Sequence, residues 1–110
     1  MGILVCIESP YAGDITANKD YLQKCMRDSI MNHGEVPMAS HQLYTDCLDD
    51  NEPSERALGL NLGYVWMELC EKVVVYTDLG ISGGMKAAID NAQSIGKIIE
   101  FRKLPVAKNK

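Results

Sequence analysis

The stretch VVVYTDLGISGGMKAAIDNAQSIGKII, residues 73–99, decides the fold, because it passes from one apolar run to another through a glycine-rich turn. The runs at its two ends, within 72–76 and 98–101, are short and apolar, as buried strands are. Between them, apolar residues recur at helical spacing over 83–95, and Gly96 follows where helices commonly end. The residues that we expect to face inward on this helix are Met85, Ile89, Ala92 and Ile95. The stretch therefore predicts a strand, a turn, a helix and a second strand.

The first third of the chain repeats this alternation of strand and helix. The apolar run 3–7 predicts a strand that is buried on both faces. A helix is expected over 18–33, with Gly34 at its C-terminal cap. The run 36–39 contains a proline, which favours an edge strand. The inward stripe of the helix is expected to consist of Leu22, Cys25, Met26 and Ile30.

A polar segment, residues 40–53, separates the second strand from the next helix. We expect it to be a loop, and a loop this long in a small domain is often functional. Ser54 is a suitable N-cap for the helix that follows. Apolar residues of that helix recur at spacings of four, three and four, and we expect them to face the core: Leu58, Leu62, Val65 and Leu69.

The order of these elements predicts one α/β domain over residues 1–101, with a parallel sheet of about four strands covered by helices on both faces. Right-handed crossovers favour the strand order 2-1-3-4. The order reverses between the first and third strands, and ligands bind such sheets beyond the carboxyl ends of the strands at that point. Residues 8–14 and 77–84 are therefore expected to lie side by side at a ligand site.

Composition excludes several classes of function. The net charge is −4, and the four bases of a basic C-terminal tail, 102–110, leave −8 on residues 1–101, which argues against a nucleic-acid groove. The four cysteines have no CxxC spacing, so no metal site is expected and the thiols are expected to be reduced in the cytoplasm. No signal peptide or membrane span is visible in the sequence.

The glycine turn is suited to binding an anion. Gly80, Gly83 and Gly84 allow the backbone to approach a ligand closely, and the helix after them offers free N–H groups and the Ser82 hydroxyl. Asp14 and Asp78 could accept ribose hydroxyls, or they could cap turns; His41 could bind the ligand or be packed as a polar residue. The residues expected at the ligand are Ser9, Pro10, Tyr11, Gly13, Asp14, His41, Asp78, Ser82, Gly83, Gly84 and Met85.

Several blocks of the sequence together resemble one family. The blocks are SPYAGD at 9–14, PMASHQLY at 37–44, LDDNEPSERALGLNLG at 48–63, and ISGGM at 81–85 with GK at 96–97. They resemble small phage and bacterial members of the nucleoside 2-deoxyribosyltransferase-like family over residues 3–101. The resemblance implies a flavodoxin-like three-layer sandwich, assembly into a homodimer or higher homo-oligomer, and a pocket for a nucleoside or nucleotide.

The resemblance also implies where catalysis would occur. In catalytic relatives, a glutamate on the helix after the glycine turn attacks C1′ of the sugar and forms a covalent glycosyl intermediate. Counting along the motif gives position 88, and this chain has Ala88. Asp90 is two residues further on and projects about 200° around the helix. Glu8, on the first loop, could reach the pocket as a substitute.

Three functions remain open at this stage, and none of them requires a cofactor. The first is a non-catalytic binder of a nucleotide or NAD-derived molecule, such as ADP-ribose; if phage-encoded, it could act in the host cytoplasm as a sponge for a nucleotide immune signal. The second is an active N-glycosidase or deoxyribosyltransferase that uses Glu8 or a partner subunit's acid, or an enzyme whose Ala88 was introduced to trap substrate. The third is an interaction protein with a vestigial pocket.

Overall fold

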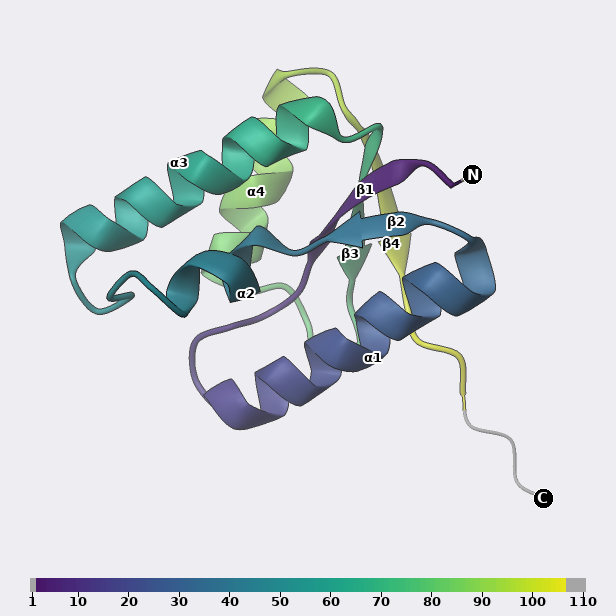
Figure 1. Cartoon of the computed structure of the whole chain (residues 1–110), viewed down its shortest axis with the longest axis horizontal. Helices are drawn as coiled ribbons and strands as arrows, with labels where there is room; N and C mark the ends of the chain where they lie inside the picture. Colours follow the sequence, from purple (N-terminus) through teal and green to yellow (C-terminus); the bar gives the residue numbers. More distant parts are fainter. Residues whose placement is uncertain (1, 107–110) are drawn as a thin grey trace.

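The computed structural model describes residues 2–106, which fold into four strands and four helices (Figure 1). In chain order they are β1 (Leu4–Glu8), α1 (Ile15–His33), β2 (Val36–Met38), α2 (Ser40–Thr45), α3 (Pro53–Leu69), β3 (Lys72–Tyr76), α4 (Gly83–Ser94) and β4 (Ile98–Arg102). The strands form one sheet in the order β2-β1-β3-β4, and every neighbouring pair is parallel. The predicted strand order and the edge position of β2 are therefore confirmed.

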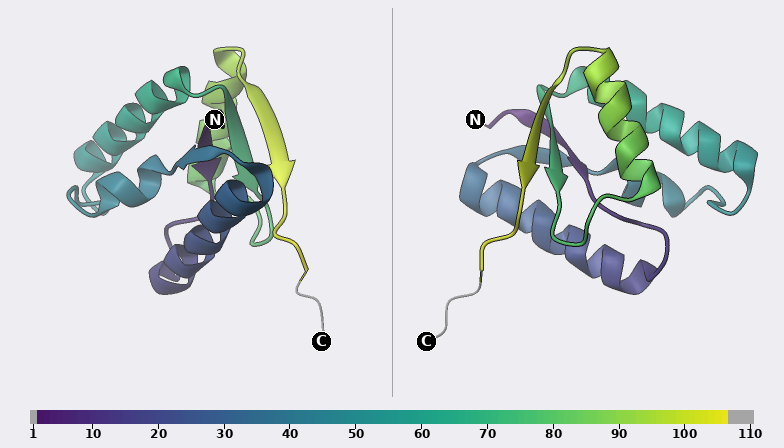
Figure 2. Two further views of the ribbon diagram at one scale, coloured as in Figure 1. Left: turned by 45° about the vertical axis from the view of Figure 1, so that its right-hand side comes forward. Right: turned by 180° about the vertical axis from the view of Figure 1, so that it is seen from behind.

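Helices cover both faces of the sheet, which gives the three layers of a flavodoxin-like sandwich (Figure 2). The helix α1 covers one face, and α3 and α4 cover the other. The core on the α1 side consists of Val5, Ile7, Tyr21, Leu22, Cys25, Ala39, Val74 and Tyr76. The core on the other side consists of Cys6, Met67, Cys70, Val73, Val75, Met85, Ala88, Ile89 and Ala92. Residues of β1 and β3 alternate between the two cores, so both strands are buried on both faces as predicted.

Three differences from the sequence prediction concern the helices. The helix α1 begins at Ile15 rather than at residue 18, because the Asp14 carboxylate caps it by accepting a hydrogen bond from Ala17 N at 3.1 Å. The segment 40–53 is not a continuous loop, since it contains α2. The N-cap of α3 is Glu52 rather than Ser54. On the helices expected to be amphipathic, Ile30 and Ile95 are exposed rather than inward.

The prediction of the inward face of α3 was wrong. Leu58, Val65 and Leu69 are 49%, 57% and 65% exposed, whereas the buried residues of this helix are Gly63 and Met67. The reason is the close approach of α3 to α2: a Cβ atom at position 63 would lie 2.5 Å from Ser40 Oγ. The side of α3 that carries Gly63 and Met67 packs against the domain, and the side that carries Leu58, Val65 and Leu69 faces outward.

Arg102 belongs to the sheet rather than to the basic tail. It ends β4, is 8% exposed, and donates two hydrogen bonds to Glu35, at 2.9 and 3.0 Å. Burial alone would raise the pKa of Glu35, but hydrogen bonds from Arg102, Ser29 and Lys72 lower it to about 2. This pair joins the last residue of β4 to the residue that precedes β2. Residues 107–110 of the expected tail lie outside the described residues. Within 2–106, no helix is both long and apolar enough to cross a membrane.

Replacing Arg102 by methionine should lower the free energy of unfolding by about 3 to 5 kcal/mol, because Glu35 is left charged and buried without its main partner. Urea denaturation at neutral pH measures the loss. The Glu35→Gln/Arg102→Met double variant should recover part of it, and the exposed control Lys103→Met should change stability by less than about 0.5 kcal/mol. Equal losses for Arg102→Met and Lys103→Met would contradict this role.

Candidate functional site

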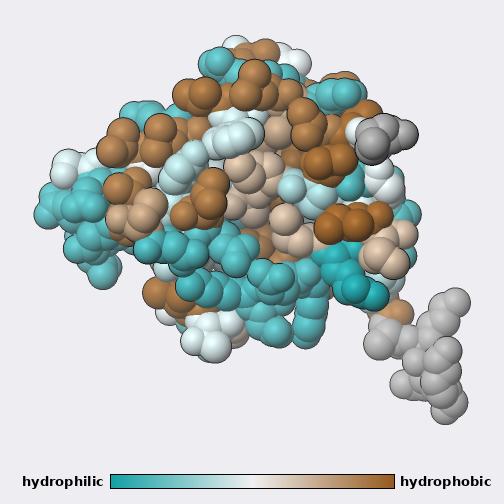
Figure 3. Space-filling view, viewed as in Figure 1, coloured by the Kyte–Doolittle hydropathy of each residue, from teal (hydrophilic) through white to brown (hydrophobic). Residues whose placement is uncertain are grey.

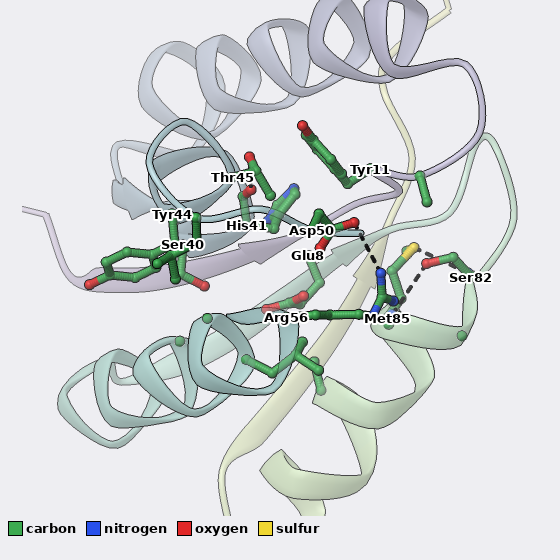
Figure 4. Close-up of a pocket in the computed structure, with 18 of the residues that line it drawn as sticks. Glu8, Tyr11, Ser40, His41, Tyr44, Thr45, Asp50, Arg56, Ser82 and Met85 are labelled. Atoms are coloured by element: carbon green, nitrogen blue, oxygen red, sulfur yellow. Dashed lines mark hydrogen bonds and ion pairs between the residues drawn. The ribbon is translucent and has the colours of Figure 1, made fainter. Parts of the chain in front are cut away.

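A cavity of about 190 Å³ opens at the carboxyl end of β1, between α2, α3 and the start of α4 (Figure 4). Its floor is formed by the end of β1 and by the first turns of α4, and its walls by α2 and α3. This is the edge of the sheet at which the strand order reverses. The cavity therefore lies at the edge that the topological argument from the sequence indicated.

Most of the residues expected at the ligand line this cavity. They are Ser9, Tyr11, His41, Ser82, Gly83, Gly84 and Met85, together with Glu8 and Ala88. Four others do not line it: Pro10, Gly13, Asp14 and Asp78. In the structure, the carboxylates of Asp14 and Asp78 accept hydrogen bonds from other groups of the chain.

Asp14 and Asp78 stabilise the backbone on the α1 side of the site. Asp14 caps α1. Asp78 accepts a hydrogen bond from Tyr21 Oη at 2.7 Å and another from Leu104 N at 3.0 Å. Burial opposes ionisation of Asp78, yet these hydrogen bonds lower the pKa of its carboxyl overall. Of the two roles that the sequence left open for these residues, the structure favours capping over contact with a sugar.

The glycine turn leaves the start of α4 open to the cavity. Ser82 is the N-cap, and its hydroxyl accepts a hydrogen bond from Met85 N at 3.3 Å. A Cβ atom added at Gly83 or Gly84 would meet no atom within 4 Å, so packing does not require glycine there. The first N–H groups of a helix have no acceptor inside it. The backbone of Gly83 and Gly84 can therefore be approached closely by a ligand.

His41 is held neutral beside Ser9. Its Nε2 lies 2.9 Å from Ser9 Oγ, while its Nδ1 is buried and has no hydrogen-bond partner within residues 2–106. Burial lowers the pKa of His41 to about 4, so the imidazole is uncharged at neutral pH. A neutral ring fits the polar-packing alternative, and it adds no positive charge for a phosphate.

Glu8 ends β1 rather than lying on the first loop, and it forms part of the cavity floor. Burial raises the pKa of its carboxyl to about 8, and no ion pair or hydrogen bond from a described residue opposes this. At neutral pH most molecules therefore carry a protonated Glu8. The same cavity is lined by Ala88, which is 4% exposed.

Sequence reasoning missed the wall that α2 and α3 provide. Tyr44 and Tyr64 line the cavity, and Arg56 forms an ion pair with Asp50 at 3.0 Å on its rim. The α3 residues that line it are Glu55, Arg56, Gly59, Leu60, Gly63 and Tyr64. Their spacing is helical, but the larger apolar residues on the other side of α3 gave the stronger hydrophobic periodicity, from which the inward face was predicted. The described residues contain no cluster of three or more His, Cys, Asp or Glu side chains that could hold a metal ion.

The raised pKa of Glu8 makes stability depend on pH in a specific direction. The folded protein keeps this proton up to about pH 8, whereas the unfolded chain releases it near pH 4.5. The contribution of Glu8 to the free energy of unfolding therefore falls as pH rises from 4.5 to 8. Glu8→Gln should stabilise the protein by about 1 to 3 kcal/mol at pH 9 and by much less at pH 4, measured by urea denaturation. An equal effect at both pH values would contradict the assignment.

Comparison with known proteins gives one match. Residues 3–102 match a family described as a domain of unknown function, DUF7768, and this range includes every strand and helix that forms the cavity. Neither a curated protein nor a solved structure matches the chain. Because the family match covers nearly the whole chain, the protein belongs to the DUF7768 family.

Proposed function

We propose that the cavity binds a nucleotide or an ADP-ribose-like molecule and holds it without cleaving it. One observation carries this proposal: Ala88 lies in the cavity wall, one turn into α4, where the enzymes that the sequence resembles have a nucleophilic glutamate. An alanine there can contact a sugar but cannot attack it. The other residues that line the cavity remain available to contact a ligand.

The phosphate-binding end of the site would be the start of α4. The N–H groups of Gly83 and Gly84 and the Ser82 hydroxyl lie at the positive end of the helix dipole. Such an end accepts phosphate without any basic side chain. This location also explains how an acidic domain could bind an anion.

A base would contact the tyrosines, which line different parts of the cavity. Tyr11, Tyr44 and Tyr64 line the cavity from three different elements. Tyrosine rings pack well against flat apolar groups, and their hydroxyls donate or accept hydrogen bonds. Together with the neutral His41, these side chains suit an uncharged heterocycle.

The remaining acids of the cavity do not replace the missing nucleophile. Glu8 is mostly protonated at neutral pH, and a protonated carboxyl does not attack a sugar. Asp50 is paired with Arg56. Glu55 accepts a hydrogen bond from Asp49 N at 2.9 Å. Binding without turnover is therefore the expected behaviour, and a sponge that sequesters a nucleotide signal is a biological role that fits it.

A second candidate function is supported by the same protonated Glu8. A carboxyl with a pKa of about 8 can donate a proton to a leaving base, as the general acid of a glycosidase does. An N-glycosidase would then use water as the nucleophile. This reaction lacks the covalent intermediate, so we expect it to be slow.

Ligand retention tests the proposal directly. The protein is incubated with a mixture of nucleosides, nucleotides and NAD-derived cyclic molecules, passed through a desalting column, and then denatured. We expect one intact compound to leave the protein only on denaturation. Free base in the mixture would support the glycosidase instead, and recovery of no compound would contradict both functions.

Restoring the acid should restore turnover. Ala88→Glu places a carboxyl in the cavity, and we expect release of free base at a rate at least about 100-fold above that of the unaltered protein. The matched control Ala87→Glu makes the same change at the neighbouring position, which does not line the cavity. Equal rates for the two variants would show that position 88 is not next to the reactive carbon of a bound sugar.

A further inference from the structure

The middle of α3 is uncharged on all sides. No residue from 57 to 67 carries a charge. A helix whose middle carries no charge can present apolar surface on more than one side. In the described chain, however, only the side with Gly63 and Met67 is buried.

The opposite side of α3 forms an apolar seam, which consists of the exposed Leu58, Val65, Trp66 and Leu69 and the half-buried Leu62. Leu58, Val65 and Leu69 are each about half exposed or more, and Trp66 is 38% exposed. The space-filling view shows a row of hydrophobic surface along the edge of the molecule that α3 forms (Figure 3). These fractions leave on the order of 400 Å² of apolar surface, about half of the ~800 Å² that one partner contributes to a standard interface.

The charges around the seam exclude two kinds of partner. Glu55 and Glu68 flank it on α3, and Glu71 follows the helix. The only base on α3 is Arg56, which is paired with Asp50. Anionic membranes and nucleic acids are bound by clusters of lysine and arginine, and none lies here.

The spacing of the seam matches a second copy of itself. The apolar residues at 58, 62, 65 and 69 are separated by four, three and four, which is the spacing of the core positions of a coiled coil. This series is symmetric about its centre, between Gly63 and Tyr64. When two such helices are placed antiparallel about a two-fold axis, Leu58 meets the partner's Leu69, and Leu62 meets the partner's Val65. A two-fold interface requires this kind of self-complementarity.

We propose that the protein forms a two-fold symmetric dimer in which the apolar seams of two α3 helices pack antiparallel. The dimer does not depend on the proposed ligand, because the seam faces away from the cavity. It would nevertheless support the site. The inner side of α3 carries Gly63 and Tyr64, which form part of the cavity wall. In the seam, Trp66 Nε1 donates a 2.7 Å hydrogen bond to the hydroxyl of Tyr44, which also lines the cavity.

Sedimentation velocity on the full chain tests the interface. We expect the protein to sediment at twice its 12.2 kDa chain mass at high micromolar concentration. Val65→Glu should give a monomer, because it places two carboxylates close together at the centre of the seam. Val65 is more than half exposed, so this variant should retain its circular dichroism spectrum and thermal midpoint. Met31→Glu, at a side chain that is 63% exposed on α1, is the matched control and should remain a dimer.

Mixing two charge variants tests the register. Leu58→Glu and Leu69→Lys should each weaken the dimer alone and should form a heterodimer when mixed, because the antiparallel arrangement brings the two positions together. A mixture of Leu58→Glu and Leu58→Lys should not form a heterodimer, since the two altered positions lie at opposite ends of an antiparallel interface. Rescue by the second mixture only would show parallel packing and overturn the proposal.

Three further results would also overturn it. They are a monomer at high micromolar concentration, a dimer that survives Val65→Glu, and a dimer that is lost in Met31→Glu. A monomer that binds neutral phosphatidylcholine vesicles, and loses that binding in Val65→Glu, would assign the seam to a lipid surface instead.

Discussion

The parallel pairing of β1 with β3 is the constraint on which the rest of the structure depends. Cys6 pairs with Val73 and Glu8 with Val75, so the two strands end at the same edge of the sheet. Because β2 lies on the other side of β1, the chain leaves these two strands in opposite directions. No crossover connection therefore passes between the segment after β1 and the glycine turn after β3. The cavity forms in that gap, and α2 and α3 close its sides.

The fold could be predicted from the sequence because buried parallel strands are continuous apolar runs and glycines end the helices. Gly34 and Gly96 have φ of 62° and 72°, the left-handed conformation that glycine adopts at a helix end without strain. The orientation of α3 could not be predicted in the same way. Its larger apolar residues dominate the periodic pattern, but steric contact with Ser40 selects the side that carries Gly63. A hydrophobic pattern identifies an apolar face and does not state whether the core or another subunit covers it.

The site was predictable in its location and only partly in its composition. Topology placed Ser9, Tyr11 and Ser82 together without any knowledge of side-chain contacts. Asp14 and Asp78 were harder to assign, since a carboxylate that follows a strand can serve as a ligand contact or as a cap; the hydrogen bonds that Ala17 N and Leu104 N donate to them favour capping. The walls from α2 and α3 come from residues distant in sequence, and no local pattern reports them.

Burial gives two of the titratable groups that line the cavity, Glu8 and His41, a common property. Burial raises the pKa of the Glu8 carboxyl and lowers that of the His41 imidazole, so both are mainly uncharged at neutral pH. A cavity in which Glu8 and His41 are neutral and a helix N-terminus lies at one end would suit the nucleotide that we propose, and it has Ala88 where the enzymes that the sequence resembles have a nucleophilic glutamate. Saturation-transfer NMR with ADP-ribose and nucleoside monophosphates tests this claim most directly. Binding without cleavage predicts saturation of the base and anomeric protons of one compound, whose spectrum then stays unchanged overnight. Resonances of a free base, or no transfer to any compound, would contradict it.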